Sequence, residues 1–132
     1  MNSHMIVYID GSALIKRAQP GSGSELATDV WRSADRVFST ELACSEARAA
    51  VDVPQTLLDD LEIVQMDSQI AEAADDLAER HGLTEGESVH LAAALSIEAP
   101  RVVVATWNPA LATAAAECGL AVVPREPALA AA

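Results

Sequence analysis

The stretch MIVYIDGSAL, residues 5–14, places an unbroken apolar run directly before a polar turn. A run that is apolar at every position predicts a strand buried on both faces, as in the centre of a parallel sheet. Asp10 ends the run, and residues 13–18 after it predict a short helix. Because ligands of such sheets bind outside the carboxyl ends of the strands, Asp10 is the first candidate site residue.

The rest of the chain alternates apolar runs, which predict strands, with segments of helical apolar spacing. Further strands are expected at residues 36–40, 62–66, 101–105 and 120–123, and helices at 24–34, 41–51, 55–61, 67–81, 84–97 and 108–118. This alternation predicts an α/β fold of three layers, with about four or five parallel strands between helices on both faces.

The length of 132 residues predicts a single domain. Residues 1–4 look like an expression-tag remnant, the domain is expected at 5–126, and the Ala-rich residues 127–132 are expected to fray. Cys44 and Cys118 lie far apart outside any paired motif, which argues against a disulfide scaffold or a zinc site. Neither a membrane span nor a signal peptide is recognisable, so a cytoplasmic location is expected.

The chain is strongly acidic, with 8 Lys and Arg against 20 Asp and Glu, a formal net charge of -12. This balance excludes an ordinary basic nucleic-acid module, but not an enzyme that reaches phosphate through a metal ion. Residues 5–52 hold five basic residues against seven acidic ones, so a rim that guides RNA is expected in that half. The candidate residues for this RNA-guiding rim are Lys16, Arg17 and Arg48.

Several polar candidates also have a purely structural explanation. Asp10 can cap the helix that follows it, and Asn108 with the next proline matches a helix N-cap. Thr84 and Glu87 match a capping box.

Glu46 and His90 are less easily explained by helix ends. Glu46 is expected on the apolar side of its helix, where a carboxylate needs a partner such as a metal ion, unless it reaches out to water. His90 is expected to be a hydrogen-bonded residue beside the core.

Most of these residues lie in four short motifs, which follow one another along the chain. The motifs are Asp10-Gly-Ser-Ala-Leu14, Thr40-Glu-Leu-Ala-Cys-Ser-Glu46, Glu87-Ser-Val-His-Leu-Ala92 and Thr106-Trp-Asn-Pro109. Together they resemble the pattern of PIN-domain ribonucleases, and nearly the whole chain is similar to the VapC-type toxins of bacterial toxin–antitoxin pairs.

The resemblance implies that water activated on Mg²⁺ or Mn²⁺ hydrolyses an RNA phosphodiester. Asp10, Glu46 and Glu87 are then the expected metal ligands and catalytic residues, with Asn108 as a weaker ligand or water-orienting group. Ser12 and Thr106 are expected to hold these carboxylates or their waters. The implied partners are a small antitoxin protein of the VapB type and a second copy of the chain.

The sequence departs from the family pattern at three positions. Gly11 replaces a usual Thr, Glu87 a common Asp, and Asn108 a common Asp, which removes one negative charge. A PIN-like domain that binds RNA or protein with little or no cleavage is therefore the alternative.

Two other enzyme-like classes lack a required residue. A haloacid-dehalogenase phosphatase needs an Asp where this chain has Tyr8. A receiver domain needs a lysine after its last strand, whereas Lys16 is the only lysine.

Overall fold

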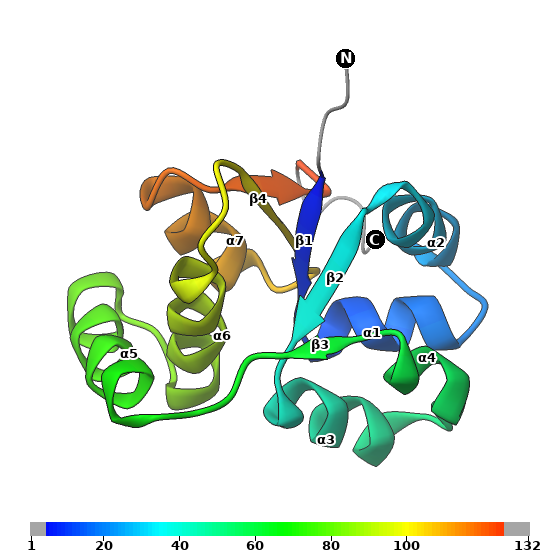
Figure 1. Ribbon diagram of the computed structural model, residues 1–132, viewed down its shortest axis with the longest axis horizontal. Helices are drawn as coiled ribbons and strands as arrows, with labels where there is room; N and C mark the ends of the chain where they lie inside the picture. The colour runs from blue at the N-terminus through cyan, green and yellow to red at the C-terminus, as the bar shows by residue number, and fades with distance from the viewer. Residues whose placement is uncertain (1–4, 126–132) are drawn as a thin grey trace.

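A computed structural model describes residues 5–125 of the chain (Figure 1). The predicted tag remnant at 1–4 and the predicted tail at 127–132 lie outside the described residues. Within this range the strands form one five-stranded sheet, and every pairing is parallel. The strands are β1 (Ile6–Ile9), β2 (Arg36–Ser39), β3 (Glu62–Ile63), β4 (Val102–Ala105) and β5 (Ala121–Val123).

The sheet order is β3-β2-β1-β4-β5, so β1 is central and pairs with both β2 and β4. Its residue Val7 pairs with Val37 on one side and Val103 on the other. All four residues of β1 are buried, which confirms the prediction from its uninterrupted apolar run. β3 is shorter than expected, because its partner β2 ends at Ser39, where the chain turns into the next helix.

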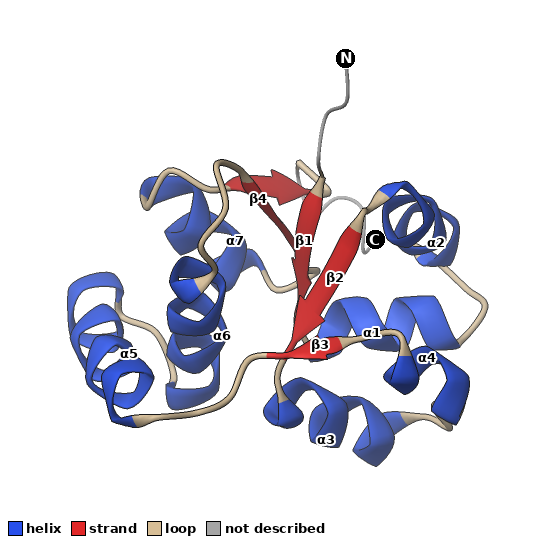
Figure 2. Ribbon diagram, viewed as in Figure 1, coloured by secondary structure: helices blue, strands red, loops and turns tan. Residues whose placement is uncertain are grey.

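Helices cover both faces of the sheet, as Figure 2 shows, which confirms the predicted three-layer α/β fold. Side chains of β1 alternate between two cores: Ile6 and Tyr8 face one, and Val7 and Ile9 the other. The helices are α1 (Gly11–Ala18), α2 (Ser24–Ser33), α3 (Glu41–Ala50), α4 (Gln55–Asp59), α5 (Ser68–His81), α6 (Glu85–Ser96) and α7 (Pro109–Glu117). The first core is closed by α5, α6 and α7, and the second by α1, α2 and α3.

Local signals account for the helix ends. Asp67 caps α5, since its side chain accepts a hydrogen bond from the backbone N–H of Ile70 at 2.8 Å. Gly82 ends α5 with a φ of 65°, the left-handed conformation that glycine adopts without steric cost. In the described part of the chain, none of the helices combines the length and the apolar character needed to cross a bilayer.

Candidate active site

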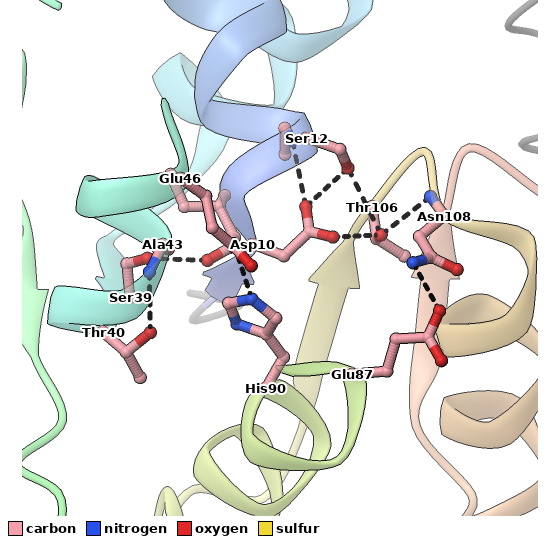
Figure 3. A network of polar contacts seen from close by, with 12 residues as sticks. Asp10, Ser12, Ser39, Thr40, Ala43, Glu46, Glu87, His90, Thr106 and Asn108 are labelled. Carbon is pink, nitrogen blue, oxygen red and sulfur yellow. Dashed lines mark hydrogen bonds and ion pairs between the residues drawn. The ribbon is translucent and has the colours of Figure 1, made fainter. Parts of the chain in front are cut away.

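Polar side chains from both halves of the chain gather at the carboxyl edge of the sheet (Figure 3). Asp10 follows β1, and Thr106 and Asn108 follow β4, the strand beside it. Glu46 comes from α3 and Glu87 from the first turn of α6. The parallel topology therefore brings the four predicted ligands to the same edge, although they are up to 98 residues apart in sequence.

Asp10 is buried, and three donors hold its carboxylate. Oδ1 accepts hydrogen bonds from Ser12 Oγ at 2.7 Å and from the backbone N–H of Ala13 at 2.9 Å. Oδ2 accepts one from Thr106 Oγ1 at 2.6 Å. The cap on α1 and the proposed site thus use the same carboxylate, and Oδ2 keeps one acceptor position for a further ligand.

Glu46 pairs with His90, and its Oε1 lies 2.9 Å from His90 Nε2. The Glu46 side chain is 40% exposed, whereas that of His90 is 5% exposed. Of the two expectations for Glu46, the structure agrees with the one in which the side chain reaches out to water. Apolar packing is not found, because the buried residues of α3 are Ala43, Cys44 and Ala47. His90 is hydrogen-bonded beside the core, as predicted.

The Glu46–His90 pair ends a buried chain of hydrogen bonds. Tyr8 Oη lies 2.8 Å from His90 Nδ1 and 3.3 Å from Thr40 Oγ1. A carboxylate only accepts, so Nε2 carries the proton toward Glu46, and in neutral His90 Nδ1 accepts from the Tyr8 hydroxyl. Burial raises the pKa of Tyr8, which keeps it a neutral donor. His90 is thereby locked in one orientation, and it fixes Glu46.

Glu87 is held at the start of α6 by a capping box with Thr84. Its Oε1 accepts from the Thr84 backbone N–H at 3.0 Å, while Thr84 Oγ1 accepts from the Glu87 backbone N–H at 3.2 Å. Its Oε2 accepts from Asn108 Nδ2 at 2.8 Å. The backbone bond from Thr84, followed by the Asn108 bond, lowers the pKa of Glu87.

Asn108 uses both ends of its amide. Its Oδ1 accepts from the backbone N–H groups of Ala110 and Leu111, at 3.0 and 3.1 Å, and so caps α7. These two bonds use both acceptor positions of the carbonyl oxygen. In this arrangement Asn108 orients Glu87, and ligation of a metal by Asn108 stays a prediction.

The side chains at this edge fit a divalent cation that keeps several waters better than one that is surrounded by protein ligands. Within residues 5–125, no three Asp, Glu, His or Cys side chains are close enough together to hold a metal ion. Mg²⁺, however, is commonly bound through one or two carboxylates and keeps several waters. Asp10 and Glu46 are the pair placed to supply these carboxylates, because the Glu46 side chain lies against Gly11, the residue after Asp10.

The predicted RNA-contacting cations lie on α1 and α3. Lys16 Nζ is 6.0 Å from the centre of the Trp107 ring, and the Arg17 guanidinium carbon is 5.3 Å from that of Trp31. Arg48 is exposed in the last turn of α3. Arg17 is thus engaged within the protein, and the contact of these residues with RNA stays a prediction.

Curated relatives share nearly the full length of the chain. They include Ribonuclease VapC45 of Mycobacterium tuberculosis (strain CDC 1551 / Oshkosh) and Ribonuclease VapC49 of Mycobacterium tuberculosis (strain ATCC 25618 / H37Rv). Each is 33% identical over 139 residues, which covers 92% of this chain and 96% of the relative. The chain belongs to the VapC-type PIN ribonuclease family. No protein-family model matches it.

One departure from the usual VapC pattern, Gly11, lies in contact with Glu46. A Cβ at Gly11 would overlap Glu46 Oε1 and would lie 2.7 Å from Glu46 Cβ. A second glycine, Gly86, would place a Cβ 3.7 Å from Glu46 Oε2. Gly11 therefore leaves room for the Glu46 side chain in the position that it takes in this structure.

Two residues that shape this VapC site are absent from the sequence-based candidates, Tyr8 and Thr40. The signal for Tyr8 is its hydroxyl within an otherwise aliphatic buried strand, because a buried tyrosine hydroxyl requires a partner. The signal for Thr40 is its place directly before α3, where it caps the helix through the backbone N–H of Ala43.

Proposed function

We propose that this protein is a divalent-metal-dependent endoribonuclease and the toxin of a toxin–antitoxin pair. The observation that carries the proposal is the position of Asp10 and Glu46 at the carboxyl edge of the sheet, where the Glu46 side chain lies against Gly11, in a chain of the VapC-type family. Carboxylates at this edge of the sheet are the ligands that Mg²⁺ and Mn²⁺ prefer.

Each residue has a distinct part in the proposed reaction. A bound Mg²⁺ or Mn²⁺ supplies a water of lowered pKa and neutralises charge on the phosphate. Asp10, oriented by Ser12 and Thr106, holds the ion. Glu46 Oε2 has no hydrogen-bond partner among residues 5–125, so it is available to the ion or to a bound water. Glu87 and Asn108 border the site, where they orient water or the RNA.

Because the protein is strongly acidic, few cationic side chains are available to guide RNA to the site. With a formal charge of -12, the protein as a whole repels RNA. Lys16 and Arg48 are part of helices that begin at the site edge and carry cations in their last turns. We assign the approach of RNA to this side of the molecule.

Neutralisation by a VapB-type antitoxin follows from the same charges. An arginine of the antitoxin would pair with the carboxylates of Asp10 or Glu46, and so would compete with the metal. The active form is a homodimer in this proposal.

The test is cleavage of RNA by the purified protein with Mg²⁺, with Mn²⁺ and with EDTA. Cleavage should require either ion, and Glu46→Gln should abolish it while the protein stays folded, since Gln keeps an oxygen that accepts from His90. Glu41→Gln is the matched control, because Glu41 is an exposed carboxylate on the same helix. Full cleavage in EDTA by contaminant-free protein, or by Glu46→Gln, contradicts the proposal.

One observation favours a second function, a PIN-like domain that binds RNA or protein with little or no cleavage. Asn108 uses its oxygen to cap α7, so it does not add a charge or a free acceptor to the site. For this function no RNA is cut, and Mg²⁺ or Mn²⁺ leaves the melting temperature unchanged, whereas an ion that binds the native state of the nuclease raises it.

A further inference from the structure

A cluster of a thiol, an imidazole and a carboxylate lies at the ends of two helices, outside the candidate active site. His81 is the last residue of α5, Glu117 is the last residue of α7, and Cys118 is the C-cap of α7. Cys118 Sγ lies 3.6 Å from His81 Nε2, and His81 Nδ1 lies 3.1 Å from Glu117 Oε1. Asn108, at the other end of α7, is about 15 Å away along the helix axis.

The hydrogen-bonding capacities of the three groups assign their protons. The Glu117 carboxylate only accepts, so Nδ1 of His81 carries the proton between them. Nε2 of the neutral ring is then an acceptor, and it faces the thiol of Cys118. A nucleophile bonded to a base that a third group orients is the arrangement of an activated nucleophile.

Access distinguishes this thiol from the other cysteine. Cys118 is partly exposed, and so is His81, whose side chain is 15% exposed. Cys44 is buried at 3% exposure, no imidazole within residues 5–125 forms a hydrogen bond with it, and burial raises its pKa. A small reagent in solution therefore meets only one thiol that has both an open approach and a base.

We propose that Cys118 is a modification site that reacts with small-molecule disulfides by thiol–disulfide exchange. As Sγ attacks one sulfur of R–S–S–R, His81 Nε2 takes the thiol proton. The S–S bond of the reagent breaks, a Cys118–S–S–R bond forms, and the proton passes from His81 to the leaving R–S⁻, which departs as R–S–H. Cysteine is oxidised, the reagent is reduced, and excess thiol reverses the step.

The experiment treats the folded, reduced protein at neutral pH with bis(2-hydroxyethyl) disulfide, an uncharged reagent that the net charge does not repel. Mass spectrometry of the intact protein gives the rate, and peptide mapping gives the site. The adduct should form on Cys118 and not on Cys44. His81→Gln should lower the second-order rate constant about tenfold, because it removes the base. Glu117→Gln should lower it less, and Glu79→Gln, an exposed charge-matched control on α5, should leave it unchanged.

Two results overturn the proposal. One is an equal rate in His81→Gln and in the original protein, with both shown to be folded by thermal unfolding. The other is equal labelling of Cys44 and Cys118 in the folded state. If His81→Gln unfolds, Glu117→Gln decides, since its side chain is 59% exposed and its loss costs little structure; a rate equal to that of Glu79→Gln then contradicts the proposal.

Discussion

At the scale of single residues, the carboxylate of Asp10 depends on hydroxyl donors. Thr106→Val keeps the shape of a buried side chain but removes its bond to Asp10 Oδ2. We expect a loss of about 2 kcal/mol in unfolding free energy, because a bond to a charged group is lost in the interior. Urea unfolding measures this, and cleavage should fall with it. Thr113→Val, at an exposed position on α7, is the control, and equal losses in the two variants would contradict the role of Thr106.

Asn108→Asp tests whether this residue belongs to the metal site. The change removes the bond from Nδ2 to Glu87 and sets two carboxylates beside each other, while a good N-cap remains. In EDTA the melting temperature should fall. Added Mn²⁺ should then raise it by more than it raises that of the original protein, since the added charge strengthens binding of a cation. Equal Mn²⁺-induced shifts in the two proteins would leave Asn108 as a cap alone.

Contacts between residues that are far apart in the chain are the feature that the sequence predicts least well. The roles of Asp10, Thr84, Glu87 and Asn108 at helix ends follow from neighbours in sequence, and the structure contains each of these caps. The Glu46–His90 pair joins residues 44 apart, and it depends on how α3 and α6 are rotated toward each other. No local pattern specifies that rotation, so the sequence alone leaves open whether Glu46 lies in apolar packing or reaches out to water.

At the scale of elements, the Tyr8 hydroxyl links β1 to α6 and α3. Tyr8→Phe leaves Nδ1 of the buried His90 without its donor, which should cost about 1–3 kcal/mol. Because His90 then no longer fixes Glu46, cleavage should fall even at temperatures where the variant is fully folded. Thr40→Ser, which keeps the hydroxyl bonded to Tyr8, should change both quantities little. Unaltered cleavage by folded Tyr8→Phe would show that the chain of hydrogen bonds does not serve the site.

The capping box of α6 predicts a pH dependence of stability. The folded-state pKa of Glu87 is lower than its unfolded value, so its ionised form stabilises the fold. Glu87→Gln should therefore be less stable than the original protein by about 0.5–1 kcal/mol above the unfolded pKa of about 4.3. The difference should shrink as pH falls through the folded pKa, since protonated Glu resembles Gln. Urea unfolding in EDTA across this range is the measurement, with Glu85→Gln as control; a difference that does not vary with pH would contradict the assignment.

The elements themselves were largely predictable. Each expected strand and helix exists, with ends within a few residues, because apolar spacing and caps are local properties. The strand order was not predictable, since it depends on contacts between distant segments. The expected strand at 62–66 is shorter for the same reason: past Val64, no strand in the described part of the chain lies beside it to form hydrogen bonds.

At the scale of the whole molecule, the charge of -12 acts against the compact state. In EDTA, raising the KCl concentration from low to physiological and beyond should raise the melting temperature, because salt screens repulsion between the surface carboxylates. Replacing KCl by NaCl should give the same curve, since screening does not depend on the identity of the cation. A melting temperature that is constant with salt would show that self-repulsion is not a significant cost.

The central position of β1 also determines the order in which the site residues come together during synthesis. The ribosome releases β1, β2 and β3 first, and with them Asp10 and Glu46. Thr106 and Asn108 can take their places only after β4 has inserted on the free side of β1. A nascent chain therefore lacks a donor to Asp10 and the partner of Glu87 until β4 and the residues after it emerge. For a ribonuclease translated from RNA, this order of assembly delays completion of the active site until β4 and the start of α7 have been translated.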